Sequence, residues 1–175
     1  MMPLSSFMLV GVILFGLAGL LRGGSREFLG TVSVFLAVFV INLSEKYAPY
    51  VAQIAADPHQ AKTLFWIRVF IFVTIVFFGY QTPRWGTFGN RNMGGLKDAL
   101  VGALLGALNG YLIVGMLWHY MDVANYPWPT FIAPPSPHDA LSNRILQYLP
   151  SMFLHAPILY IAVAIFFVLV IVIIL

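Results

Sequence analysis

The side chains best suited to acid–base or metal chemistry are His119 and Asp122. They stand three positions apart, so they share one face of a helix. An imidazole and a carboxylate placed together could bind a proton, a metal or a pigment. Zinc sites use three or four protein ligands, and the chain contains no cysteine. The pair therefore predicts a capped helix end rather than a metal site.

A second group contains the residue types of a hydrolase triad: Ser136, His138 and Asp139. Closeness in sequence does not produce triad geometry, and Ser136 or Asp139 is better explained as a helix N-cap. The chain also lacks a Walker loop and a Gly-x-Gly-x-x-Gly turn. We therefore predict no enzymatic activity and no cofactor.

Four charged residues, Arg22, Arg26, Glu27 and Asp98, are expected at one edge of the molecule. An ion pair between Asp98 and either arginine would fix the first apolar block against the fourth. The alternative is that the arginines orient the helices and meet lipid phosphates.

Arg68 differs from these four because it lies inside an apolar block. Such residues are functional candidates. It is close enough to the start of the block, however, to extend its guanidinium to the membrane surface, and we expect this.

The composition explains why these polar residues are so few. Of 175 residues, 61% are apolar and 9% are charged, and the mean hydropathy is +0.91. A soluble domain carries about 25% charged residues, so a soluble or a disordered chain is excluded. Nine basic and six acidic residues give a net charge of +3, which is too sparse for nucleic-acid binding. The long apolar blocks predict an all-α, polytopic transmembrane protein.

Five blocks are expected to span the membrane: residues 4–21, 28–43, 63–80, 96–120 and 156–175. No lysine or arginine precedes the first block, so we interpret it as a retained helix and not a signal peptide. We divide the chain into a four-helix membrane domain (1–122), a Pro-rich segment with an amphipathic interfacial helix (123–155) and a C-terminal transmembrane helix (156–175).

The fourth block carries small residues at four-residue spacing, which places them on one side of a helix. They are Gly102, Gly106 and Gly110, with Ala99, Ala103 and Ala107 beside them. In lipid, small residues let helix backbones approach closely. This face predicts packing against the first and second blocks of the same chain, or else against another subunit. The bulky third and fifth blocks are expected to be peripheral or to face lipid.

The basic residues also predict an orientation. The loops after the first and third blocks carry five of them, and the opposite side carries three: Arg22, Arg26, Arg84, Arg91 and Lys97 against Lys46, Lys62 and Arg144. Basic loops stay in the cytoplasm. The N-terminus and the Pro-rich segment are therefore expected outside.

Two segments resemble the CvpA family, the colicin V production proteins of bacterial inner membranes. The first is the Gly-x-x-Arg-Gly-x-x-Arg-Glu turn over residues 19–27, and the second is Asp98 followed by the glycines of the fourth block. The resemblance covers about residues 7–122. The family often has basic residues where Ala99 and Asn109 stand here.

The resemblance implies a non-enzymatic inner-membrane protein that acts by helix packing in envelope or export processes. Its expected partners are membrane lipids and other transmembrane proteins, in homo- or hetero-oligomers, and not nucleic acid. Two other hypotheses remain: an accessory subunit of a respiratory or photosynthetic membrane complex, and a small channel or transporter. We expect no buried acids within the blocks, which argues against ion-coupled transport.

Overall fold

The computed structural model describes residues 4–81, 95–128, 132, 134–137 and 139–174. Within these residues the ordered elements are all helical. The four long helices are α1 (Leu4–Arg22), α2 (Gly24–Tyr47), α4 (Ala61–Gln81) and α5 (Leu96–Val123). Each is long and apolar enough to cross a membrane. The expected all-α, polytopic membrane fold is therefore confirmed.

Shorter elements connect and follow the four long helices. They are α3 (Pro49–Ala56), η1 (Pro58–Gln60), α6 (Ala140–Leu146), η2 (Pro150–Met152) and α7 (Ile158–Ile174). α7 has 17 residues and is shorter than the four candidate spans. Whether it crosses the membrane stays a prediction.

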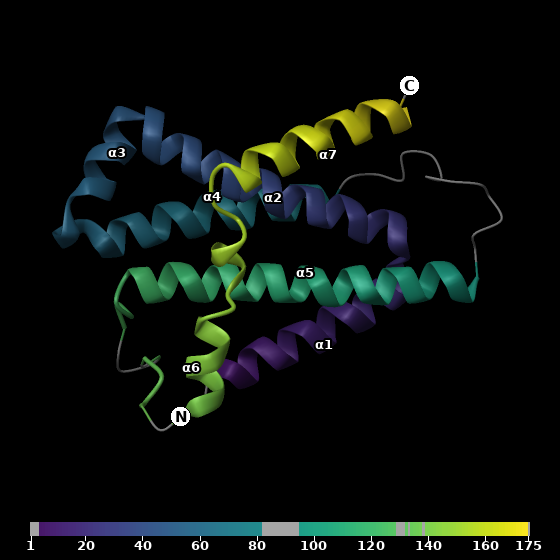
Figure 1. Ribbon diagram of the computed structural model, residues 1–175, viewed down its shortest axis with the longest axis horizontal. Helices are drawn as coiled ribbons and strands as arrows, with labels where there is room; N and C mark the ends of the chain where they lie inside the picture. The colour runs from purple at the N-terminus through teal and green to yellow at the C-terminus, as the bar shows by residue number, and fades with distance from the viewer. Residues whose placement is uncertain (1–3, 82–94, 129–131, 133, 138, 175) are drawn as a thin grey trace.

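Helix α5 occupies the middle of the molecule, with α1 on one side and α2 and α4 on the other (Figure 1). Helix α1 runs antiparallel to α5 and has its main contact there. Helix α2 packs against α4, α5 and α7. The loop residues 82–94, which include Arg84 and Arg91, lie outside the described residues.

The contact between α1 and α5 is formed by glycines from both helices. A Cβ atom on Gly102 would lie 2.2 Å from the carbonyl oxygen of Gly19, and one on Gly106 would lie 2.2 Å from that of Phe15. Such distances require side-chain-free backbone. We call Gly102, Gly106 and Gly110 of α5, with Gly11, Gly16 and Gly19 of α1, the glycine contact.

The alanines predicted beside these glycines are less enclosed. Gly16 faces the backbone of Ala103 and the methyl group of Ala107 at ordinary contact distance, while Ala99 lies near the start of α5 and is half-buried. The face of α5 that carries small residues, which we call its small face, is thus covered by α1 of the same chain.

The main apolar core lies between α2, α4 and α5, so the third block, which was expected to be peripheral or to face lipid, lines the core with one of its sides. Phe72 of α4 is fully buried, packs against Tyr120 and belongs to the same cluster as Val34 and Leu112. Helix α4 is apolar on every side, so its sequence gave no indication of which side would face inward. Helix α4 therefore faces the core on one side and is exposed on the other, and α1 contacts α2 only slightly.

The predicted amphipathic helix after the Pro-rich segment is shorter than expected. It ends at Leu146, and Leu149 adopts an extended conformation before Pro150. Proline disfavours helical geometry in the residue before it. Leu149 instead packs with Met8 and Trp118, so this segment rests on the four-helix body.

Candidate functional site

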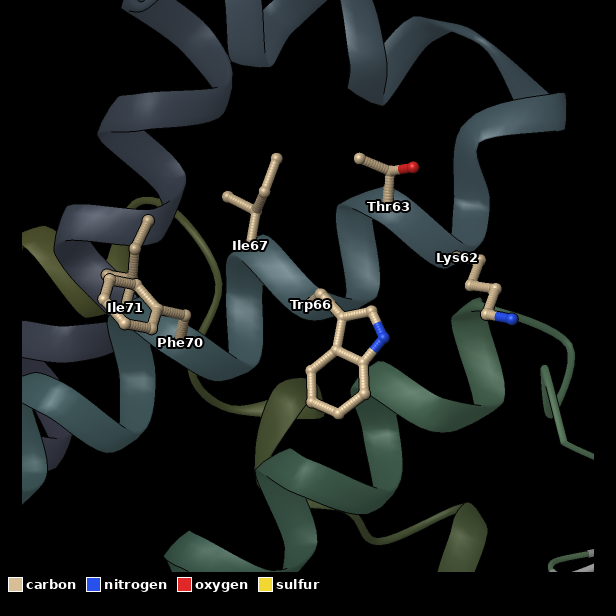
Figure 2. A pocket seen from close by; sticks show the side chains of 6 residues that line it. All are labelled: Lys62, Thr63, Trp66, Ile67, Phe70 and Ile71. Atoms are coloured by element: carbon tan, nitrogen blue, oxygen red, sulfur yellow. The ribbon is translucent and has the colours of Figure 1, made fainter.

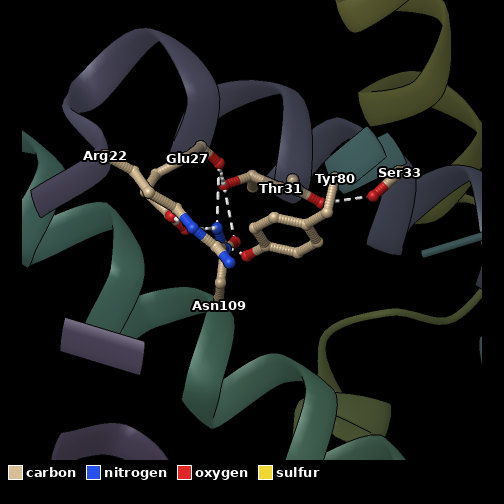
Figure 3. Close-up of polar contacts among 7 residues, drawn as sticks. Arg22, Glu27, Thr31, Ser33, Tyr80 and Asn109 are labelled. Carbon is tan, nitrogen blue, oxygen red and sulfur yellow. Dashed lines mark hydrogen bonds and ion pairs between the residues drawn. The ribbon is translucent and has the colours of Figure 1, made fainter. Parts of the chain in front are cut away.

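A polar cluster is buried where α2, α4 and α5 meet, close to the turn between α1 and α2 (Figure 3). Glu27 of α2 and Asn109 of α5 are both 0% exposed. The amide nitrogen Nδ2 of Asn109 donates to the Glu27 carboxylate oxygen Oε2 at 2.9 Å and to the Glu27 backbone oxygen at 2.8 Å. Asn109 thereby links α5 to α2.

Thr31 and Tyr80 complete the hydrogen bonds of this cluster. The Thr31 hydroxyl lies 2.8 Å from Asn109 Oδ1 and 3.1 Å from the Glu27 backbone oxygen. The Tyr80 hydroxyl, from α4, donates to Glu27 Oε2 at 2.9 Å. Three helices are therefore joined through one carboxylate.

Arg22, the last residue of α1, covers the cluster from outside. Its Nη1 lies 3.8 Å from Glu27 Oε1, and its guanidinium stands 5.2 Å from the centre of the Tyr80 ring. Its side chain is 45% exposed, whereas that of Glu27 is 1% exposed. The positive charge therefore lies between the buried carboxylate and the surroundings.

One oxygen of the cluster has no hydrogen bond. Glu27 Oε1 is buried without a donor in range, although Oε2 of the same carboxylate accepts two hydrogen bonds. The arrangement holds the carboxylate in place and leaves one of its oxygens without a hydrogen bond. The expectation that no acid is buried within the helices is therefore wrong.

Of the two alternatives for Asp98 and the arginines, an ion pair between them is not found in the part of the chain that the structure describes. Asp98 Oδ1 accepts a hydrogen bond from the backbone nitrogen of Gly24 at 3.0 Å. Within the described residues, no ion pair joins Asp98 to Arg22 or Arg26, and Arg26 is exposed. Asp98 instead caps the first turn of α2, where the free backbone N–H groups favour a negative charge.

The backbone geometry of the turn between α1 and α2 explains why Asp98 binds the Gly24 backbone. Gly23 has φ +85°, a conformation that favours glycine, and a Cβ there would lie 2.3 Å from Asp98 Oδ2. The turn therefore brings the Asp98 carboxylate directly against the backbone. The connection to α5 is made through the start of α2 and not through an arginine side chain.

Arg68 does not extend to the surface as expected. Its guanidinium donates to both carboxylate oxygens of Glu45 from α2, at 2.6 Å and 3.2 Å. It also stands 5.8 Å from the centre of the Tyr120 ring. A two-point pair of this kind fixes α4 against α2.

His119 and Asp122 both lie near the end of α5. Among the residues that the structure describes, no group of three potential metal ligands occurs. The ring of His119 lies 5.9 Å from that of Tyr120. Asp122 lies beside Tyr126. Burial raises the pKa of the Tyr126 hydroxyl to about 12. The indole N–H of Trp118 donates a hydrogen bond to this hydroxyl, which acts in the opposite direction and lowers the pKa.

The triad-type residues have local roles where they are described. Asp139 Oδ1 accepts a hydrogen bond from the backbone nitrogen of Ser142 and caps α6, so the predicted N-cap is confirmed. The Ser136 backbone oxygen accepts a hydrogen bond from the Asn143 amide. His138 lies outside the described residues.

A shallow cavity of about 470 Å³ lies on the surface of α4 (Figure 2). Its lining forms two parallel rows at helical spacing: Lys62, Trp66 and Phe70, and Thr63, Ile67 and Ile71. Trp66 and Phe70 are exposed. This is a depression between side-chain ridges of a single helix, and its lining offers one charged group.

Sequence reasoning missed Asn109, Thr31, Tyr80 and Glu45 as partners of the charged residues. Two signals were present: Thr31 follows Glu27 by four positions, and Asn109 is the one amide within the glycine-rich block. What was missing was the alignment of the helices. Asn109 meets Glu27 across 82 positions of sequence.

Comparison with known proteins agrees with the family resemblance of residues 19–27 and of the glycines that follow Asp98. None of the curated proteins and none of the solved structures that were compared matches the chain. The model of the family described as "Colicin V production protein" matches residues 4–135, a longer stretch than the turn and glycine motifs indicated. The matched stretch contains α1 to α5 and therefore every residue of the buried polar cluster. With four helices able to cross a membrane among the described residues, and a family match over most of its length, the chain is a multi-pass membrane protein that belongs to the colicin V production protein family.

Proposed function

We propose that this chain is a non-enzymatic protein of the bacterial inner membrane that acts by packing against other membrane proteins in envelope or export processes such as colicin V production. The observation that carries the proposal is that buried and half-buried polar side chains make hydrogen bonds between helices. They join helices to one another: α2 to α5 through Asn109, α2 to α4 through Arg68 and Glu45, and α1 to α6 through Ser142.

The exposed surface supports the same proposal. Large apolar side chains are exposed along α1, α4 and α5, including Leu14, Phe70 and Leu104. Such surfaces suit acyl chains and the helices of partner proteins equally. The glycine contact is already occupied by α1 of the same chain, so partners would have to meet these outer faces.

An orientation belongs to this proposal. Arg22, Arg26 and Lys97 lie at the end of the molecule where the α1–α2 turn meets the start of α5. Basic residues favour the cytoplasm. We place this end in the cytoplasm, with the N-terminus and α3 on the outer side.

A complementation experiment tests the role in colicin V production. Cells that carry the colicin V genes and lack this chain are expected to regain export, measured as a growth-inhibition zone, when the chain is restored. Gly106→Leu is expected to fail because it disrupts the glycine contact, while Gly95→Ala, where an added Cβ meets nothing within 4 Å, is expected to succeed. Unchanged export with the wild-type chain present in the membrane contradicts this role.

Purification from native membranes in mild detergent, followed by native mass spectrometry, tests the mode of action. A defined hetero-assembly of membrane proteins without cofactors supports packing with partners. A fixed respiratory or photosynthetic assembly, or a homo-oligomer that conducts ions in bilayers, contradicts the proposal in favour of the two other hypotheses.

A further inference from the structure

Glu27 presents an unusual combination of complete burial and incomplete hydrogen bonding. Its side chain is 1% exposed, and it lies inside a bundle of membrane helices. Its Oε2 atom accepts hydrogen bonds from Tyr80 and Asn109, whereas Oε1 accepts none. A buried carboxylate ordinarily has partners for both oxygens. Oε1 is thus the one position of this carboxylate where a proton can add without displacing a donor.

The charged and titratable groups around Glu27 come from each neighbouring helix. Helix α1 contributes Arg22, α4 contributes Tyr80, and α5 contributes the neutral Asn109. Asp98 of α5 is held by the Gly24 backbone, and Arg26 of α2 is exposed. The arginine is therefore the one cation facing Glu27 among the described residues.

Arg22 is held by attraction and not by a hydrogen bond. Its distance of 3.8 Å from Oε1 exceeds hydrogen-bond length. A guanidinium only donates hydrogen bonds. A proton on Oε1 would remove the negative charge and place a second donor in front of Arg22. Because Arg22 ends α1 and its side chain is 45% exposed, it can turn toward water or lipid phosphates.

From this geometry we propose that Glu27 is a proton-binding site, in which uptake of one proton on Oε1 releases Arg22 from the bundle. The carboxylate takes a proton from a hydronium ion at the Arg22 end, which leaves a carboxylic acid and a water molecule, and the reverse step transfers the proton back to water. Arg22 lies between this site and the surroundings of the bundle. Loss of the proton restores the ion pair across the end of α1.

Infrared difference spectroscopy of the full chain in lipid bilayers tests the site directly. Acidification is expected to produce a carboxylic C=O band at the frequency of a buried acid. Glu27→Gln is expected to lack that band. The matched variants Glu45→Gln, whose carboxylate is paired with Arg68, and Asp98→Asn, whose carboxylate accepts from the Gly24 backbone, are expected to retain it. A band that persists in Glu27→Gln overturns the proposal.

A second variant keeps the Glu27 carboxylate and removes the Arg22 cation that lies against it. Arg22→Gln is expected to show the same carboxylic band already at a pH where the wild-type chain shows none, because the stabilising cation is gone. In the wild-type chain, the ¹⁵Nε resonance of Arg22, assigned by its loss in Arg22→Lys, is expected to move over the same pH range as the band. An Arg22 resonance that stays fixed while the band develops contradicts the release of Arg22.

Discussion

At the scale of single residues, Asn109 carries the connection between α5 and α2. It donates two hydrogen bonds to Glu27 and accepts one from Thr31. Asn109→Ala removes these three buried hydrogen bonds, one of them to a carboxylate oxygen, which costs about 1–3 kcal/mol. We expect a clear fall in the thermal unfolding temperature in detergent.

Asn42→Ala is the matched control for this change. Asn42 is half-buried and donates only to the Val38 backbone oxygen of its own helix. We expect a much smaller fall in unfolding temperature. Equal effects of the two substitutions would contradict a connecting role for Asn109.

Asp139 offers a residue-scale prediction about pH. The hydroxyl and the backbone N–H of Ser142 lower the pKa of Asp139 below its ordinary 3.8. The cap therefore contributes its stability above the unfolded pKa and loses it as the pH falls through the lowered value. Amide hydrogen exchange at Ser142 is expected to accelerate below about pH 4, beyond the intrinsic pH effect.

Asp139→Asn is the control for the cap. An asparagine also caps helices but does not titrate, so Ser142 exchange is expected to follow the intrinsic pH dependence alone. If the wild-type chain and this variant show the same pH profile, the carboxylate does not control the start of α6.

Residue roles could be predicted from the sequence where they depend on local geometry. The Asp139 cap acts across three positions and was foreseen. Glu27 and Arg68 were not, because their partners depend on how separate helices align: Arg68 meets Glu45 across 23 positions of sequence, and Glu27 meets Tyr80 across 53. The sequence shows a charge in each case but not the helix that neutralises it.

At the scale of elements, the glycine contact sets the distance between α1 and α5. A Cβ on Gly106 would lie 2.2 Å from the Phe15 backbone oxygen, so Gly106→Ala must push the two backbones apart. Overpacking costs about 1–3 kcal/mol. We expect a lower thermal unfolding temperature for this single-methyl change.

Gly95→Ala provides the same chemical change in open space, since a Cβ there meets nothing within 4 Å. Its unfolding temperature is expected to stay close to that of the wild-type chain. If Gly106→Ala is as stable as Gly95→Ala, close backbone contact does not hold α1 in place.

Helix positions were more predictable than helix neighbours. The apolar blocks located α1, α2, α4 and α5 to within about one turn at most ends, because length and hydropathy define a membrane helix. The neighbours of α4 could not be read in the same way. Its phenylalanines lie on all sides, and only the fold shows that Phe72 is buried while Phe70 and Phe77 are exposed.

At the scale of the whole molecule, the basic residues predict which end faces the cytoplasm. The absence of cysteine makes this testable with single cysteines. Lys97→Cys and Lys62→Cys place an exposed thiol near opposite ends of the bundle. A membrane-impermeant maleimide is expected to label position 62 in intact spheroplasts and position 97 only after permeabilisation. The reverse pattern would contradict the proposed orientation.

The family match places the helix body of this molecule within a known membrane family, with α6 and α7 beyond it. The central claim about this body is that α1 of the same chain covers the small face of α5. A disulfide requires Cβ atoms about 3.5–4.5 Å apart. A Cβ on Gly16 would lie 3.5 Å from that of Ala107, so these two positions suit a cross-link.

The decisive measurement is disulfide formation in native membranes by the Gly16→Cys/Ala107→Cys double variant. Gly16→Cys/Phe70→Cys is the control, because Phe70 is exposed on α4. We predict rapid oxidation of the first variant to an intramolecular disulfide, seen as a monomer of altered mobility on non-reducing gels, and none in the control. Cross-linked dimers in place of that monomer, or no cross-link at all, would contradict the account.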